Sequence, residues 1–143
     1  MAVEIRRLTP ADAFLLDRVA DDVFDEPVDH ARLAAYLAEP GHLMLVAIDD
    51  GTVIAQLAAV IHRHPDKPTE LYIDEVGVTP AFQRKGIARK MLDTMISIGR
   101  DLGCEEAWVG TEPDNLAARG LYGSRGGTAE PFVMYVYKLD PDS

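Results

Sequence analysis

Apolar residues recur along the chain with two periods, and these periods predict the order of its helices and strands. Apolar runs and alternating patterns predict strands at residues 3–8, 42–48, 52–61, 71–78, 106–111 and 132–139, and a further short strand is allowed before the last one. Spacings of three and four residues, with capping residues before them, predict helices at about 10–22, 30–39, 83–102 and 115–122.

This order of elements predicts an α/β fold, classed as α+β in some schemes, with one mixed, mostly antiparallel sheet of six or seven strands and helices on both faces. The unit from residue 71 to residue 111 is strand, helix, strand, so its two strands are expected to be parallel and joined by a right-handed crossover. The length of 143 residues fits a single domain spanning 1–143. A domain of this size buries roughly 68–70% of its unfolded surface and needs no disulfide or metal for stability.

Charge narrows the classes of partner. The net charge of −10 argues against nucleic acid, whose phosphates need a basic surface. Four of the fourteen basic residues nevertheless fall within the eight positions 83–90, which leaves 10 positive and 24 negative charges elsewhere, a balance of −14. One compact basic cluster in an acidic protein is typical of a single anion site. Taken alone, however, the cluster is better explained as a solvated helix start.

The remaining composition predicts a cytoplasmic protein with no membrane partner. Cys104 is the one cysteine in the sequence, so no disulfide can form within the chain. The first seven residues contain no apolar signal core, and no apolar run approaches the ~18 residues of a membrane span.

The segment between strand 71–78 and the long helix has the chemistry of a phosphate site. A helix start carries about four unpaired N–H groups and roughly half a positive charge, and both attract anions. Gly86 would let a ligand approach the backbone, and Arg84, Lys85 and Arg89 would add full charges. We therefore expect a pyrophosphate here. The glycine patterns of dinucleotide-binding folds and of nucleotide triphosphatases are both missing from the sequence.

The pattern Gln83-Arg84-Lys85-Gly86-Ile87-Ala88 follows a strand ending in Val76-Gly77-Val78, and a second segment contains Asn115 and Leu121-Tyr122. Together these features resemble the GNAT N-acetyltransferase superfamily over nearly the whole chain. The resemblance implies a GNAT-like acyl-CoA N-acyltransferase fold, acetyl-CoA as the cofactor, and a pantetheine arm lying between the fourth and fifth strands, which splay apart. Its implied cofactor-binding residues are Val76, Gly77, Val78, Gln83, Arg84, Lys85, Gly86, Ile87, Ala88, Arg89, Asn115 and Arg119.

The branch of the superfamily is indicated by three further stretches. Residues 71–78, the pair Leu121-Tyr122 and the ending Met134…Leu139-Asp140-Pro141 are most similar to aminoglycoside 3-N-acetyltransferases. The resemblance then implies an N-acetyltransferase that moves the acetyl group of acetyl-CoA to a primary amine of a small cationic acceptor. A protein N-terminal or lysine acetyltransferase and a non-catalytic acyl-CoA-binding module are the alternatives. A homodimer is common among similar enzymes.

Glu75 is the leading candidate for the general base that keeps the amine neutral. It lies in an apolar strand, where burial raises the pKa of a carboxylate toward a useful value. Strict alternation places Glu75 on one face with Leu71 and Ile73, and Asp74 on the other, so the two carboxylates are not expected to serve one spot. Asp74 is the substitute candidate. A loop cap or an arginine partner is an equally strong explanation for Glu75.

Two other steps of acetyl transfer also have candidates. Gly77 inside a strand predicts a bulge or a close backbone approach, and the resemblance implies that an amide near Val76 polarises the thioester carbonyl. Tyr122 is the candidate acid for the departing sulfur, on one helix face with Asn115 and Arg119 at spacings of seven, four and three residues. A packing glycine and a core tyrosine are the respective alternatives.

Two clusters remain. His62 and His64 lie two residues apart in a loop rich in proline, which we interpret as a surface loop near the acceptor site, so no metal is predicted, although metal binding is the alternative. The acidic residues of the first two helices form a solvated face or attract a cationic amine: Asp21, Asp22, Asp25, Glu26 and Asp29.

Overall fold

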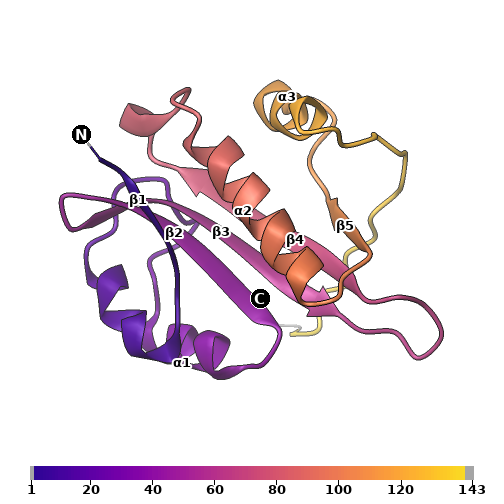
Figure 1. The fold of residues 1–143 in the computed structure, drawn as a ribbon, viewed down its shortest axis with the longest axis horizontal. Coiled ribbons are helices and arrows are strands. Elements are labelled where there is room, and N and C mark those ends of the chain that lie inside the picture. Colours follow the sequence, from indigo (N-terminus) through magenta and orange to yellow (C-terminus); the bar gives the residue numbers. More distant parts are fainter. Residues whose placement is uncertain (1, 141–143) are drawn as a thin grey trace.

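The computed structural model describes residues 2–140, so Pro141 of the C-terminal motif lies outside the described part. Within it, five strands form one sheet in the order β1-β2-β3-β4-β5 (Figure 1). Neighbouring strands are antiparallel except β4 and β5, which are parallel as the crossover predicted. The predicted mixed sheet is confirmed, with five described strands instead of six or seven. Their bounds are β1 Glu4–Arg7, β2 His42–Asp49, β3 Thr52–His62, β4 Glu70–Val78 and β5 Glu106–Val109.

Helices cover both faces of this sheet, as predicted. The helix α2 lies along β3 and β4 on one face, and η1 and α1 pack on the opposite face (Figure 1). The described helical elements are η1 Pro10–Asp17, α1 His30–Ala38, η2 Pro80–Phe82, α2 Ile87–Asp101 and α3 Leu116–Ser124. No helix within residues 2–140 combines the length and the hydropathy needed to span a bilayer.

The α2 face of the sheet carries the larger cluster of buried side chains. Met91 and Met95 are fully buried against the sheet, and each contributes about 1.5–3 kcal/mol by leaving water. Leu102 continues the same apolar stripe but is 47% exposed, because it is the residue at which the helix ends. The stripe therefore fixes which side of α2 meets the sheet.

The opposite face depends on capped helices and on a chain segment that crosses β3. The Asp29 carboxylate accepts a hydrogen bond from the Arg32 N–H at 2.9 Å, so Asp29 is the N-cap of α1. The first helix is a short 3-10 helix ending at Asp17, and the prediction that it reached Asp22 is wrong. The Arg18 carbonyl accepts from the Val53 N–H at 2.8 Å, so pairing with β3 replaces further helical turns.

The C-terminal segment, residues 132–139, forms no strand, which contradicts the prediction from its apolar pattern. Its large apolar side chains point into solvent, from Phe132 at 66% exposed to Leu139 at 93% exposed. A strand needs a partner as well as a pattern, and this segment pairs with no strand of the described sheet. β5 consequently lies at the edge of the sheet, where Trp108 is 42% exposed and stacks on Tyr72 instead of lying in the core.

Candidate functional site

A β-bulge in β4 determines where the candidate catalytic carboxylates lie. Ile73 pairs with Ala59 and Glu75 pairs with Ala58, so Asp74 is the extra residue. The bulge was predicted at Gly77, but Gly77 pairs regularly with Gln56. The prediction of a bulge in this strand was therefore correct, but the bulge lies three residues before the predicted position.

The bulge changes the alternation of side chains along β4. Before it, Ile73 packs in the core under α2; after it, Val76 and Val78 pack against that same core. Glu75 is therefore turned to the other face, and the prediction that it shares a face with Ile73 is wrong. Burial raises the pKa of Tyr36 on α1 to about 12, and the charges of both Asp74 and Glu75 act in the same direction. The two carboxylates therefore lie near one group, and the prediction that they serve different spots is also wrong.

The half-buried Glu75 side chain has the perturbed acidity that a general base needs. Burial raises its pKa, as the apolar strand predicted, and the charges of Asp25 and Asp74 raise it further. A hydrogen bond from the backbone N–H of Asp25 acts in the opposite direction. Glu75 thus lies against the segment 18–29, and no arginine is among the groups that shift its pKa.

At Gly77 the backbone of this segment comes very close to β4. A Cβ atom built on Gly77 would lie 2.1 Å from the carbonyl oxygen of Val23. The same carbonyl accepts a hydrogen bond from the Gln56 side-chain amide at 3.3 Å, and Val23 and Gln56 are both buried. Gly77 is required because any side chain here would push the segment 18–29 off the sheet, and this is the close backbone approach that the sequence predicted as one alternative.

The segment 16–30 surrounds a cavity of about 700 Å³ that is open to solvent. Its acidic lining residues are Asp17, Asp21, Asp22, Asp25 and Glu26. Asp29, predicted as part of this acidic group, does not line the cavity and caps α1 instead. Asp25 is shared between the cavity and the surroundings of Glu75, so the acidic surface continues to the candidate base.

The predicted anion loop lies between β4 and α2. The helix begins at Ile87, not at Gln83, because Arg84 and Gly86 have positive φ angles of 62° and 80°, which a helix cannot include. The Gln83 side-chain amide donates to the Val78 carbonyl at 3.0 Å and so ties the loop to the end of β4.

This loop ends in a helix start that has room for an anion. The Lys90 N–H is bonded to the Gly86 carbonyl at 3.1 Å, whereas helix geometry leaves the preceding N–H groups without an intrahelical acceptor. A Cβ atom on Gly86 would meet nothing within 4 Å, so the space beside these amides is open. The side chains of Arg84, Lys85 and Arg89 are exposed around it, while Ala88 is half-buried and Ile87 packs in the core. These amides and charges suit a diphosphate.

The edge of β4 that leads to this loop is not covered by β5. The two strands pair only from Glu70 opposite Glu106 to Ile73 opposite Val109. From the bulge to Val78, β4 therefore has no β5 partner within the described residues. This is the separation of the fourth and fifth strands that the resemblance implied.

The three candidates near α3 have different surroundings. The Asn115 side-chain oxygen caps α3 by accepting from the Ala118 N–H at 3.0 Å, and exposed Arg119 donates to the Pro113 carbonyl at 2.8 Å. Tyr122 is half-buried against the core under α2, and burial raises its pKa. Asn115 is the N-cap residue of α3 and Arg119 and Tyr122 lie within the helix, so their common face stays a prediction.

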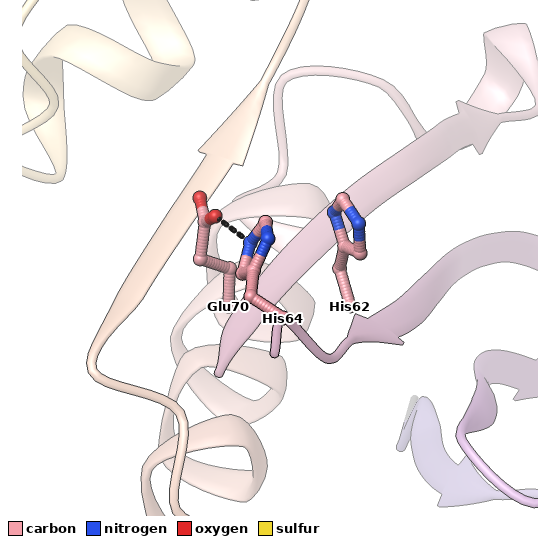
Figure 2. A group of neighbouring side chains, drawn as sticks. All are labelled: His62, His64 and Glu70. Carbon is pink, nitrogen blue, oxygen red and sulfur yellow. Dashed lines mark hydrogen bonds and ion pairs between the residues drawn. The ribbon is translucent and has the colours of Figure 1, made fainter. Parts of the chain in front are cut away.

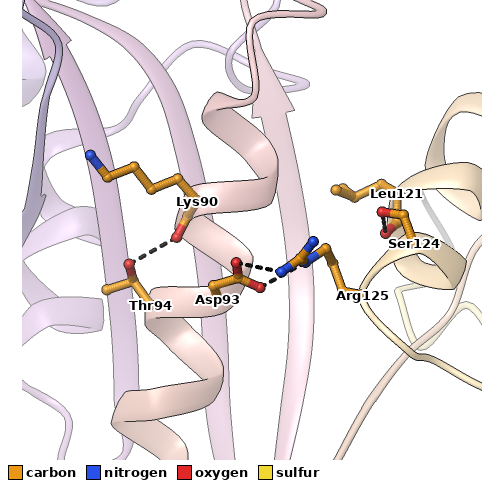
Figure 3. A network of polar contacts seen from close by, with 6 residues as sticks. All are labelled: Lys90, Asp93, Thr94, Leu121, Ser124 and Arg125. Carbon is orange, nitrogen blue, oxygen red and sulfur yellow. Dashed lines mark hydrogen bonds and ion pairs between the residues drawn. The ribbon is translucent and has the colours of Figure 1, made fainter.

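Sequence reasoning missed the contact that holds α3 in place. The Arg125 guanidinium forms two hydrogen bonds of 2.9 Å with the Asp93 carboxylate, joining α3 to α2 (Figure 3). Ser124 donates to the Leu121 carbonyl at 2.8 Å within the last turn of α3 (Figure 3). The pair spans 32 positions of sequence, and only the fold brings its members together. It anchors the helix that carries Tyr122.

Residues 10–126 match the sequence profile of the acetyltransferase (GNAT) family, which covers most of the chain. The chain belongs to this family. Membership confirms the predicted superfamily, fold class and acetyltransferase activity, for which acetyl-CoA is the cosubstrate.

Individual relatives include enzymes with different acceptors. The N-alpha-acetyltransferase RimI of Mycobacterium tuberculosis is 30% identical over 126 residues, covering 87% of this chain and 77% of the relative. The aminoglycoside N(6')-acetyltransferase type 1 of Salmonella typhimurium is 25% identical over 118 residues, covering 77% of this chain and 81% of the relative.

Among solved structures, the aminoglycoside N-acetyltransferase AAC(6')-Iy in complex with CoA superposes with a TM-score of 0.79 at 20% identity, covering 97% of this chain and 96% of that chain. At this identity the likeness shows the fold. The two aminoglycoside enzymes compared here are named for the 6' position, so the predicted 3-N branch is not supported.

Proposed function

We propose that this acetyltransferase moves the acetyl group of acetyl-CoA directly to a primary amine of a small cationic acceptor. The observation that carries this proposal is the acidic cavity of the segment 16–30, which continues through Asp25 to the half-buried Glu75. Five acidic residues that line this cavity attract a molecule with several amino groups. The aminoglycoside enzymes of the same fold, among them AAC(6')-Iy, have acceptors of this chemical class.

Acetyl-CoA would extend from the anion loop along the edge of β4. It would lie on the side of the bulge opposite the acidic cavity. Its diphosphate would accept hydrogen bonds from the amides at the start of α2, with Arg84, Lys85 and Arg89 balancing the charge. Its pantetheine arm would follow the edge Val76–Val78, which β5 leaves unpaired. The thioester would then come close to Glu75, one residue away along the strand.

In the reaction, the acceptor nitrogen attacks the thioester carbonyl carbon, the C–S bond breaks and CoA leaves as the thiolate. Glu75, directly or through a water, takes the proton from the amine, and its raised pKa suits that role near neutral pH. Asp74 lies on the same face and is the second candidate base. Tyr122, whose pKa is raised, stays protonated and would donate a hydrogen bond to the sulfur as charge grows there.

The acceptor is tested by measuring CoA thiol release with aminoglycosides, polyamines and N-terminal peptides, with products identified by mass spectrometry. We expect turnover with the polycationic small molecules. The double variant Asp21→Asn/Asp22→Asn should raise their KM about two- to thirtyfold, from about 0.2–1 kcal/mol per exposed charge pair, and leave the KM of acetyl-CoA unchanged.

The matched control is Asp50→Asn. Asp50 has a positive φ angle of 49°, as Asp22 has one of 62°, but lies outside the cavity lining. An unchanged KM in the double variant, or the same rise in the control, would contradict a cationic acceptor in this cavity.

One observation favours a second candidate, acetylation of a protein N-terminus. The RimI enzyme of Mycobacterium tuberculosis has the higher identity of the two relatives described above. In the same panel, turnover confined to peptides would favour this function. The Asp21/Asp22 variant then has little effect on neutral peptides, which separates the two candidates.

We also propose that the enzyme forms a homodimer through residues 132–139. The support is the run of exposed apolar side chains there, including Tyr135 at 79% and Tyr137 at 82% exposed, together with the edge of β5 that no described strand covers. Exposed apolar surface of this kind is typical of protein contacts. Sedimentation velocity at micromolar concentration should give the mass of two chains, and a monomer would contradict this contact.

A further inference from the structure

A second cluster of chemically active side chains lies at the far end of the β3–β4 hairpin. His62, His64 and Glu70 each offer a ligand atom, and these three atoms lie within 4.8 Å of one another. The three side chains rise from the same side of the hairpin (Figure 2). None of the three belongs to the candidate acetyltransferase site.

The fold explains why three residues from two strands meet here. His62 is the last residue of β3 and lies directly opposite Glu70, the first residue of β4. Directly opposed residues share a face of the sheet, and His64 comes two residues after His62. The two imidazole rings have centroids 4.2 Å apart, and the His64 Nε2 atom is hydrogen-bonded to the Glu70 carboxylate.

We propose that His62, His64 and Glu70 form a binding site for Zn²⁺. Two imidazole nitrogens and one carboxylate oxygen are a donor set that zinc accepts, at about 2.0–2.2 Å and with tetrahedral geometry. Ligand atoms around such an ion lie about 3.4 Å apart. To reach that spacing, the exposed His62 side chain turns toward the other two, and the hydrogen bond between His64 Nε2 and the Glu70 carboxylate is replaced by a bond from each group to the metal. A water molecule completes the coordination.

The position of this site indicates a structural clip and not a part of acetyl transfer. Glu70 lies at the start of β4 and Val78 at its end, eight residues away, which is about 26 Å at about 3.3 Å per residue. The metal would join the last residue of β3 to the first residue of β4 and so close the loop 63–69. A metal that binds only the folded hairpin, and not the unfolded chain, stabilises the folded state.

The test is a calorimetric titration of the chelator-treated full chain with ZnCl₂, together with thermal melting. We expect one Zn²⁺ per chain, and a melting midpoint raised by about 5–10 °C when zinc is present at 100 times its Kd. His62→Gln removes one ligand from an exposed position without breaking the His64–Glu70 hydrogen bond, so this variant should fold. It should bind zinc at least about tenfold more weakly, as should Glu70→Gln.

The matched control is Asp66→Asn, which removes one carboxylate from the same loop outside the cluster and should bind zinc as the wild type does. Mg²⁺ at the same concentrations should not shift the melting midpoint, because it is a poor partner for imidazole. The proposal is overturned if the wild type binds no zinc, if His62→Gln binds it with unchanged affinity, or if Mg²⁺ stabilises the chain equally.

Discussion

Replacing Gly77 by alanine tests the packing that holds the acceptor segment against β4. The added Cβ would lie 2.1 Å from the Val23 carbonyl oxygen, whereas real Cβ atoms essentially never come closer than 3.0 Å to such an atom. The difference, 3.0 − 2.1, means that backbone must move by about 0.9 Å. The backbone sets the position of a Cβ atom, and the Val23 oxygen belongs to the backbone, so no side-chain rotation can relieve the contact.

The cost has two parts. Overpacking of this kind costs about 1–3 kcal/mol. Displacing Val23 also weakens the 3.3 Å bond from the buried Gln56 amide, and a buried donor left without a partner costs about 1–3 kcal/mol. Gly77→Ala should therefore lower the free energy of unfolding by about 2–6 kcal/mol, out of a typical 5–15 kcal/mol. The melting midpoint should fall by about 6–20 °C.

Gly120→Ala is the matched control with the opposite expected sign. Gly120 lies inside α3, and a Cβ atom there would meet nothing within 4 Å. Alanine should raise the free energy of unfolding by about 0.8–1 kcal/mol through helix propensity alone.

Both variants are compared by calorimetric melting and by steady-state kinetics. In Gly77→Ala the acceptor KM should rise, because the cavity moves with the segment 18–29. A Gly77→Ala protein as stable as the wild type, with an unchanged acceptor KM, would refute this reasoning.

Four further predictions concern the cofactor loop and the reacting groups. Gly86→Asp should abolish CoA binding in calorimetry while the fold is kept. Gly86→Asn has the same shape and no charge, so it should bind CoA more weakly than the wild type but more tightly than Gly86→Asp. An unchanged CoA affinity in Gly86→Asp would remove the anion site. Glu75→Gln should lower kcat by about 10²–10⁴-fold. Burial raises the folded-state pKa of Glu75, so its contribution to stability is present at low pH and is lost as pH rises through that pKa. Glu75→Gln should therefore have a higher melting temperature than the wild type at pH 7. At pH values under 4 this advantage should disappear. Tyr122→Phe should lower kcat by up to about 10²-fold with CoA affinity unchanged, and full activity would leave Tyr122 a packing residue. Arg125→Gln should cost about 0.2–1 kcal/mol of stability and lower kcat by loosening α3, with no added effect of Asp93→Asn in the double variant; additive effects would show that the pair does not act as a unit.

Local chemistry explains why much of the fold was predictable. Asp29 caps its helix through a contact with a residue only three positions away along the sequence. The apolar stripe through Met91 and Met95 needs only the helical period to face the sheet. The loop 83–89 was likewise predictable from the sequence, because a glycine before a helix and nearby cations form an anion site from adjacent residues. The start of the helix was misplaced because the positive φ angle of Arg84 has no sequence signature.

The site on β4 was only partly predictable, because a bulge depends on the neighbouring strand. Strict alternation separated Asp74 from Glu75, and the pairing of Ile73 and Glu75 with consecutive residues of β3 brought both to one face. The 132–139 segment shows the same limit, since its strand pattern finds no partner among the described strands.

By itself, the sequence determined the family, the order of elements and the anion loop, which arise from residues close together along the chain. Only the tertiary structure decided that Asp25 lies beside Glu75, that Asp93 holds Arg125 and that His62 meets Glu70. These contacts join residues 8 to 50 positions apart, and the summed packing of the whole sheet and its helices sets such distances.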